Sequence, residues 1–63
     1  MMLTDKQYDQ IMEQLPAGAR ITKVYTAFEN GETRVVVKYA GEDRENRYVV
    51  HDEDGYPRVT LKP

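Results

Sequence analysis

The fold of this chain is decided by residues 21–39, which read ITKVYTAFENGETRVVVKY. Two runs rich in β-branched and aromatic residues flank Asn30-Gly31, a dipeptide that favours type I′ turns because both central residues need positive φ. A two-residue loop at this dipeptide sets the register of the predicted hairpin. On the apolar face, the predicted pairs are Phe28 with Thr33, Thr26 with Val35, Val24 with Val37, and Thr22 with Tyr39.

Two further turns extend the predicted hairpin into a meander, at Glu42-Asp43 and at Asp54-Gly55. The second is again a type I′ signal. Because a slip of one residue would invert every side chain, the apolar pattern itself selects two-residue loops. Pro57 has no N–H to donate, so its strand is expected at a sheet edge. The resulting pairs are Val37 with Tyr48, Val35 with Val50, Val50 with Val59, and Tyr48 with Leu61.

The segment before the hairpin has the pattern of an amphipathic helix. Thr4 and Gln7 have the spacing of a capping box, and Pro16 with Gly18 is expected to end the helix. One stripe is apolar at helical spacing, and a domain this small needs that stripe for its own core rather than for a partner. The stripe consists of Tyr8, Ile11, Met12 and Leu15.

These elements predict one small α+β domain over residues 1–63, with an N-terminal helix packed on one face of a four-stranded antiparallel β-meander in the order 1-2-3-4. A chain of 63 residues has a small core, and without cysteine it has neither disulfides nor thiolate metal sites. The expected core is Tyr8, Ile11, Met12, Leu15, Val24, Phe28, Val35, Val37, Tyr39, Tyr48, Val50, Val59 and Leu61.

The predicted registers gather basic side chains on the sheet face that the helix leaves open. In this arrangement like charges lie opposite one another at several positions, and each such pair lowers the stability of the sheet. Meanwhile the acids collect on the helix and in the turns, and the net charge is −2. The predicted rows are Lys23, Lys38, Arg47 and Lys62; Ala27, Arg34, His51 and Arg58; and, between them, Tyr25, Val36, Val49 and Thr60.

The amino-acid composition argues against catalysis and metal binding. There is no Cys and no Ser to act as a nucleophile, and no glycine-rich phosphate loop. The acids of residues 52–54 beside His51 lack the further ligands of a calcium loop. A hairpin turn explains the same residues, because Asp and Gly adopt the backbone conformations that a tight turn needs. We therefore expect no catalytic residue, no metal site and no cofactor.

The open face predicts a non-catalytic binding module for an acidic protein partner, because a cationic surface steers an anionic one. Nucleic acid is an alternative ligand for the same face, with Tyr25 as its one stacking platform. A small scaffold, engineered or orphan, with no evolved ligand is another alternative, in which lysine and arginine stems cover the apolar row and their charged ends are simply solvated. The expected partner-binding residues are Lys23, Tyr25, Arg34, Val36, Lys38, Arg47, Val49, His51, Arg58 and Lys62.

Two expectations concern assembly and location. The first strand has a single charge, Lys23, and no proline over residues 22–28. An edge of this kind recruits another strand, so a homodimer through residues 22–28 is expected unless the connection at Pro16 or the C-terminal residues cover that edge. The sequence shows neither the apolar segment of a signal peptide nor a membrane span, which favours a cytoplasmic protein without membrane contact.

Overall fold

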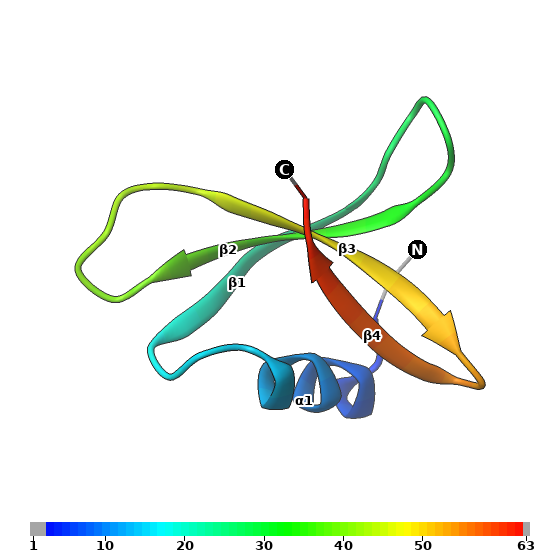
Figure 1. The fold of residues 1–63 in the computed structure, drawn as a ribbon, viewed down its shortest axis with the longest axis horizontal. Helices are drawn as coiled ribbons and strands as arrows, with labels where there is room; N and C mark the ends of the chain where they lie inside the picture. Colours follow the sequence, from blue (N-terminus) through cyan, green and yellow to red (C-terminus); the bar gives the residue numbers. More distant parts are fainter. Residues whose placement is uncertain (1–2, 63) are drawn as a thin grey trace.

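The structure is a computed structural model that describes residues 3–62, so residues 1, 2 and 63 of the predicted domain lie outside the described part. One helix and one antiparallel sheet are found there, with the strands in the order β1-β2-β3-β4 (Figure 1). The predicted α+β meander is therefore confirmed. The elements are α1 (Asp5–Gln14), β1 (Ala19–Thr26), β2 (Thr33–Tyr39), β3 (Asn46–Glu53) and β4 (Tyr56–Leu61).

Helix α1 begins at the predicted capping box. The Gln7 N–H donates to Thr4 Oγ1 at 3.1 Å, and the Thr4 N–H donates to Gln7 Oε1 at 2.9 Å. Two free backbone donors at the helix start are thus satisfied. Ile11 and Leu15 are buried against Val35 and Val37 of β2, as the apolar stripe predicts.

The side chain of Gln14 joins α1 to the outer edge of β4. Its Nε2 donates to the Pro57 carbonyl at 2.8 Å, and its Oε1 accepts from the Val59 N–H at 2.9 Å. Proline has no N–H, so these two bonds serve the backbone groups that β4 presents outward at residues 57–59. A side-chain amide therefore occupies the place of a neighbouring strand, and Pro57 lies at a sheet edge, as predicted.

The β1–β2 register differs from the prediction by two residues. Val24 faces Val35 and Tyr25 faces Arg34, because the loop spans four residues, 28–31, instead of two. The Ala27 N–H closes this loop onto the Glu32 carbonyl at 2.7 Å. Side chains alternate with a period of two, so a shift of two residues changes the partners of residues 23–26 and leaves their predicted faces in place.

Asn30 explains the longer loop. Its Oδ1 accepts from the Glu32 N–H at 3.1 Å, so the side chain makes the turn that the backbone was expected to make. Only Gly31 of the dipeptide has positive φ, at 73°. The pairing of Phe28 with Thr33 is wrong, because Phe28 lies in the loop.

A β-bulge at Thr22 adds one residue to β1. Ile21 faces Val37, whereas Lys23 faces Val36, so Thr22 has no partner of its own across the strand. The pairing of Thr22 with Tyr39 is therefore wrong. The bulge turns Ile21 toward the helix side, where it packs on the core that the sequence did not assign it to.

The other two connections give one correction and one confirmation. Val35 faces Tyr48, again two residues from the prediction, because β2 ends at a turn in which the Glu42 N–H donates to the Tyr39 carbonyl at 3.0 Å. Gly41 takes the positive φ in this turn, at 81°. The β3–β4 register is confirmed. Its turn has positive φ at both Asp54 (53°) and Gly55 (86°), as type I′ requires.

The core differs from the predicted one in its members, and buried residues lie on both faces of the sheet. Phe28 is fully exposed, Leu61 is 59% exposed, and Tyr8 and Met12 are each more than a third exposed, so these core assignments are wrong. Ala27, Val36 and Val49 are buried instead. The assignments that hold are Ile11, Leu15, Val24, Val35, Val37, Tyr39, Tyr48, Val50 and Val59.

Candidate binding face

The sheet face opposite α1 carries the predicted binding residues in new rows. Lys38 of β2 faces Arg20, and Lys23 faces Val36. The expected contacts of Lys38 with Lys23 and with Arg47 are thereby removed, because Val36 lies between Lys23 and Arg47. Like charges still lie opposite one another where Lys38 faces Arg20 and where His51 faces Arg58. The observed rows are Lys23, Val36 and Arg47; Tyr25, Arg34, Val49 and Thr60; and His51 with Arg58.

The predicted apolar middle of this face is not a surface. Val36 is 3% exposed and Val49 is 8% exposed, although no helix covers this side. Val36 lies between two long side chains of the neighbouring strands, Lys23 and Arg47, and Val49 lies between Arg34 and Thr60. The aliphatic stems of lysine and arginine cover apolar neighbours in this way while the charged ends stay in water. A partner therefore meets the charged ends first.

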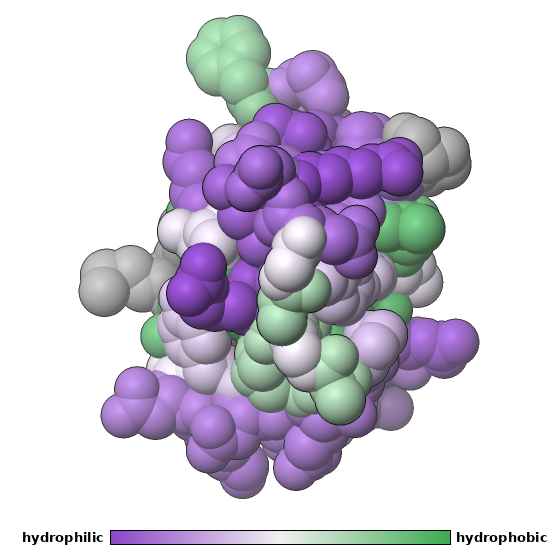
Figure 2. Space-filling model, turned by 90° about the vertical axis from the view of Figure 1, so that its left-hand side faces the viewer, coloured by the Kyte–Doolittle hydropathy of each residue, from purple (hydrophilic) through white to green (hydrophobic). Residues whose placement is uncertain are grey.

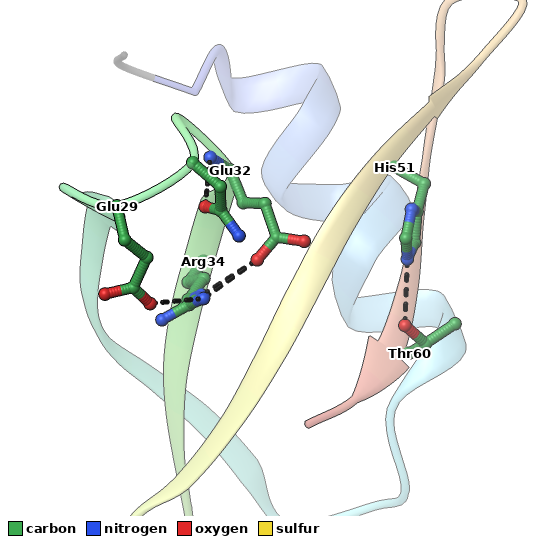
Figure 3. Close-up of polar contacts among 6 residues, drawn as sticks. Glu29, Glu32, Arg34, His51 and Thr60 are labelled. Atoms are coloured by element: carbon green, nitrogen blue, oxygen red, sulfur yellow. Dashed lines mark hydrogen bonds and ion pairs between the residues drawn. The ribbon is translucent and has the colours of Figure 1, made fainter. Parts of the chain in front are cut away.

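Arg34 is the most buried charged side chain among the described residues, at 7% exposure. Its Nη2 donates to Glu32 at 2.9 Å and to Glu29 at 3.2 Å, so it lies between the two carboxylates (Figure 3). These bonds, the one to Glu32 first, raise the pKa of Arg34 above its usual range. Arg34, and after it Asn30, lower the pKa of Glu32. Arg34 thus fastens a loop, and its guanidinium is bonded to two carboxylates of its own chain.

In the half of the face near the β3–β4 turn, the polar side chains also bond to partners within the chain. His51 Nε2 lies 2.9 Å from Thr60 Oγ1 (Figure 3), and Arg58 Nη1 donates to Glu53 at 3.3 Å. Both side chains remain exposed, so the bonds are weak in energy. Even so, His51 and Arg58 each have a partner within the chain.

The other half collects more cations than acids, and we call it the cationic half-face: Arg20, Lys23, Lys38, Arg47 and Lys62. Arg47 has a loose ion pair with Glu45, at 3.6 Å. Lys23 Nζ lies 5.6 Å from the ring centre of Tyr25, at cation–π distance. Within residues 3–62, no ion pair to a carboxylate is formed by the remaining members or by Lys23.

Two shallow hollows border the cationic half-face. One, of about 300 Å³, is lined by Gly18, Arg20, Lys38, Tyr39, Ala40, Gly41 and Glu42. The other, of about 360 Å³, is lined by Arg44, Glu45, Asn46, Arg47, Leu61 and Lys62, and we call it the Leu61 hollow. Over the described part of the chain, no group of His, Asp and Glu side chains is placed to hold a metal ion.

Arg20 and Arg44 are the residues that the sequence did not bring to this region. Arg20 lies before the Thr22 bulge, and only the bulge turns it to the same face as Lys38. Neither the bulge nor the position of Gly41 in the β2–β3 turn has a strong signal in the sequence. Arg44 lies in the β2–β3 connection. Because the length of that connection was predicted wrongly, the position of Arg44 was also predicted wrongly.

The first-strand edge is shorter than predicted. The bulge at Thr22 and the loop that starts after Ala27 leave a regular strand edge only over residues 23–26. Self-pairing through this edge stays a prediction. No helix among residues 3–62 has the length and apolar character needed to cross a bilayer.

Comparison with known proteins adds no further constraint, because no family model, curated protein or solved structure matches this chain.

Proposed function

We propose that this protein is a non-catalytic interaction module that binds an acidic protein surface through the cationic half-face. One observation carries the proposal: the cations of one half of the face are matched by Glu29, Glu32 and Glu53, whereas in the other half an acid pairs with Arg47 alone, through Glu45 at 3.6 Å. Unmatched surface charge steers an oppositely charged partner and is retained at a cost in self-repulsion. The buried Val36 beneath these side chains holds their stems in fixed rows.

A labelled peptide of alternating Glu and Asp residues tests this surface as a generic acidic probe. Its binding is measured by fluorescence anisotropy at low salt, because surface charge is screened as salt rises. The double variant Lys23→Glu/Lys38→Glu is expected to weaken binding by about tenfold or more, equivalent to ~1.4 kcal/mol. The control Lys6→Glu/Arg58→Glu changes the net charge equally, but on the helix and in the satisfied half, and should bind nearly as the parent protein does.

If both double variants weaken binding equally, the effect is due to net charge, and the proposal that the cationic half-face binds the peptide is refuted. Absence of any binding at low salt would favour a scaffold without an evolved ligand of this kind.

Nucleic acid competes for the same charges and is distinguished in the same titration. The structure supports it less, because the ring of Tyr25 is half-buried and already has Lys23 over it. A base would have to displace that contact to stack. A labelled oligothymidine should therefore bind no better than the acidic peptide. Tight binding with a log–log salt slope of about −0.7 per contacted phosphate would reverse this order.

We place this module in the cytoplasm, since the chain contains no cysteine and its fold needs no oxidising compartment. Fractionation of cells that express a tagged chain tests the assignment, and recovery outside the cytoplasm would contradict it.

A further inference from the structure

The tip of the β1–β2 hairpin carries a fully exposed aromatic side chain, Phe28. Figure 2 shows hydrophobic atoms projecting from a mostly hydrophilic surface at the top of the molecule, the level at which this loop lies in Figure 1. A large apolar side chain that is wholly in water is informative, since small domains bury such groups when they can. Phe28 contributes nothing to the core of its own chain.

The tip is held rigidly. Ala27 beside it is 4% exposed, and the Gly31 N–H donates to the Ala27 carbonyl at 2.9 Å. Arg34 fastens both sides of the loop through Glu29 and Glu32. A side chain presented on a rigid loop loses little conformational freedom on binding, which is what an anchor residue needs.

The chemistry of the tip defines the site that it fits. Glu29 has a side chain that is 72% exposed, so a carboxylate accompanies the phenyl ring at the tip. Its complement is a small apolar hollow with a cationic rim. An anionic lipid surface fits poorly, because Glu29 and Glu32 would be repelled by it.

Such a hollow lies at the opposite end of the same sheet. Leu61, which is 59% exposed, is its one apolar lining residue, and the three cations of its rim, Arg44, Arg47 and Lys62, outnumber the one acid, Glu45, which pairs with Arg47. Strand β2 starts at the tip and ends near the hollow, and Figure 1 shows the two loops on opposite sides of the molecule. A chain therefore cannot place its own tip in its own hollow.

We propose that Phe28 of one copy docks in the Leu61 hollow of a second copy, with Glu29 against the cationic rim. The contact joins two different surfaces, so it is heterologous and leads to short chains rather than to a closed dimer. It is also small, and interfaces of this size are weak and transient. The proposal goes beyond the acidic-partner function, and its test uses Phe28, Glu29 and Arg44, which are not part of the cationic half-face.

Sedimentation velocity over a dilution series tests the docking. The weight-average sedimentation coefficient of the parent protein should rise from about 20 μM to about 2 mM, the range in which weak contacts form. Phe28→Ala should abolish the rise. Met12→Ala is the matched control, since it removes a partly exposed apolar side chain from α1 and should leave the rise unchanged. A parent protein that stays monomeric, or equal loss in both variants, would overturn the proposal.

A charge exchange makes the test specific to this pair of surfaces. Glu29→Lys and Arg44→Glu should each suppress association alone, because each brings like charges together. In an equimolar mixture of the two variants, the basic tip of one meets the acidic rim of the other, and association should return. Failure of the mixture to associate would refute this docking mode. Binding of the acidic peptide by both variants, measured separately, shows whether the proposed function stands independently.

Discussion

At the scale of single residues, Arg34 holds the β1–β2 hairpin in shape. One guanidinium bonds carboxylates from both sides of the loop and is itself buried between Tyr25 and Val49. A planar, bidentate donor suits this place, and lysine does not replace it. The sequence predicted Arg34 as a partner-binding cation, because its pairing to Glu29 and Glu32 depends on a loop length that the Asn30-Gly31 dipeptide concealed.

We expect Arg34→Met to lower the melting temperature at pH 7 and Arg34→Lys to lower it less. The loss should shrink as the pH falls below the ordinary glutamate pKa of 4.5. The sign follows from linkage: the folded-state pKa of Glu32 is lowered, so its stabilisation is present above the unfolded value and is lost as the pH falls through the folded one. Thermal unfolding followed by circular dichroism at pH 7 and pH 3 measures both effects. Arg58→Met, in an exposed pair, should change little at either pH.

Tyr48 should make the stability of the fold fall as the pH rises, which is opposite to the effect of Glu32 at low pH. Its hydroxyl is hydrogen-bonded to that of Tyr39, and this contact, with partial burial, raises the pKa of Tyr48 to about 12. The folded state then keeps a proton that the unfolded state loses near pH 10, so stability should fall between pH 10 and pH 12.

The expected loss is about 1–2 kcal/mol, since one pKa unit corresponds to about 1.4 kcal/mol and part of the ring remains solvated. Tyr48→Phe should flatten the pH dependence of the urea midpoint in this range. An unchanged slope would mean that the hydroxyl pair does not form.

At the scale of elements, the turns show what could be predicted. Asp54-Gly55 forms the expected type I′ turn, and the β3–β4 register follows from it. Asn30-Gly31 has the same local signal, but the side chain of Asn30 accepts the bond and lengthens the loop. Both misread loops shift the register by two residues, which a pattern of period two cannot detect. The fold class, the faces of residues 23–26 and of the later strands, and the β3–β4 pairs were therefore predictable, whereas the β1–β2 and β2–β3 pairs were not.

Gln14 gives an element-scale prediction, because it joins the first element to the last strand. Gln14→Ala should cost about 1–2 kcal/mol, since it leaves the Pro57 carbonyl and the Val59 N–H without their partner. The intrinsic helix propensity of alanine works in the other direction. Urea denaturation measures the difference. Gln10→Ala is the control, because only the backbone carbonyl of Gln10 bonds to the sheet, through Tyr56. Equal effects of the two substitutions would contradict this role of Gln14.

At the scale of the whole molecule, the candidate site was only partly predictable. The sequence placed Lys23, Lys38, Arg47 and Lys62 on the open face, and they lie there. It did not predict which cations would be neutralised, because ion pairs such as Arg58 with Glu53 depend on loops and side-chain directions rather than on strand periodicity. Burial of Val36 was also missed, since a sheet face without a helix is expected to be solvated.

The bulge at Thr22 has a consequence for aggregation. Ile21 and Lys23 face successive residues of β2, so deletion of Thr22 would give regular alternation and keep every side chain on its present face. The edge of β1 would then be straight from Ala19 to Thr26, and such an edge templates fibrils. We expect the deletion variant to fold and to form thioflavin-positive aggregates on heating sooner than the parent chain. Thr22→Ala, which keeps the extra residue, should aggregate no faster. If the deletion variant aggregates sooner, the extra residue at Thr22 hinders pairing of the β1 edge with the edges of other copies.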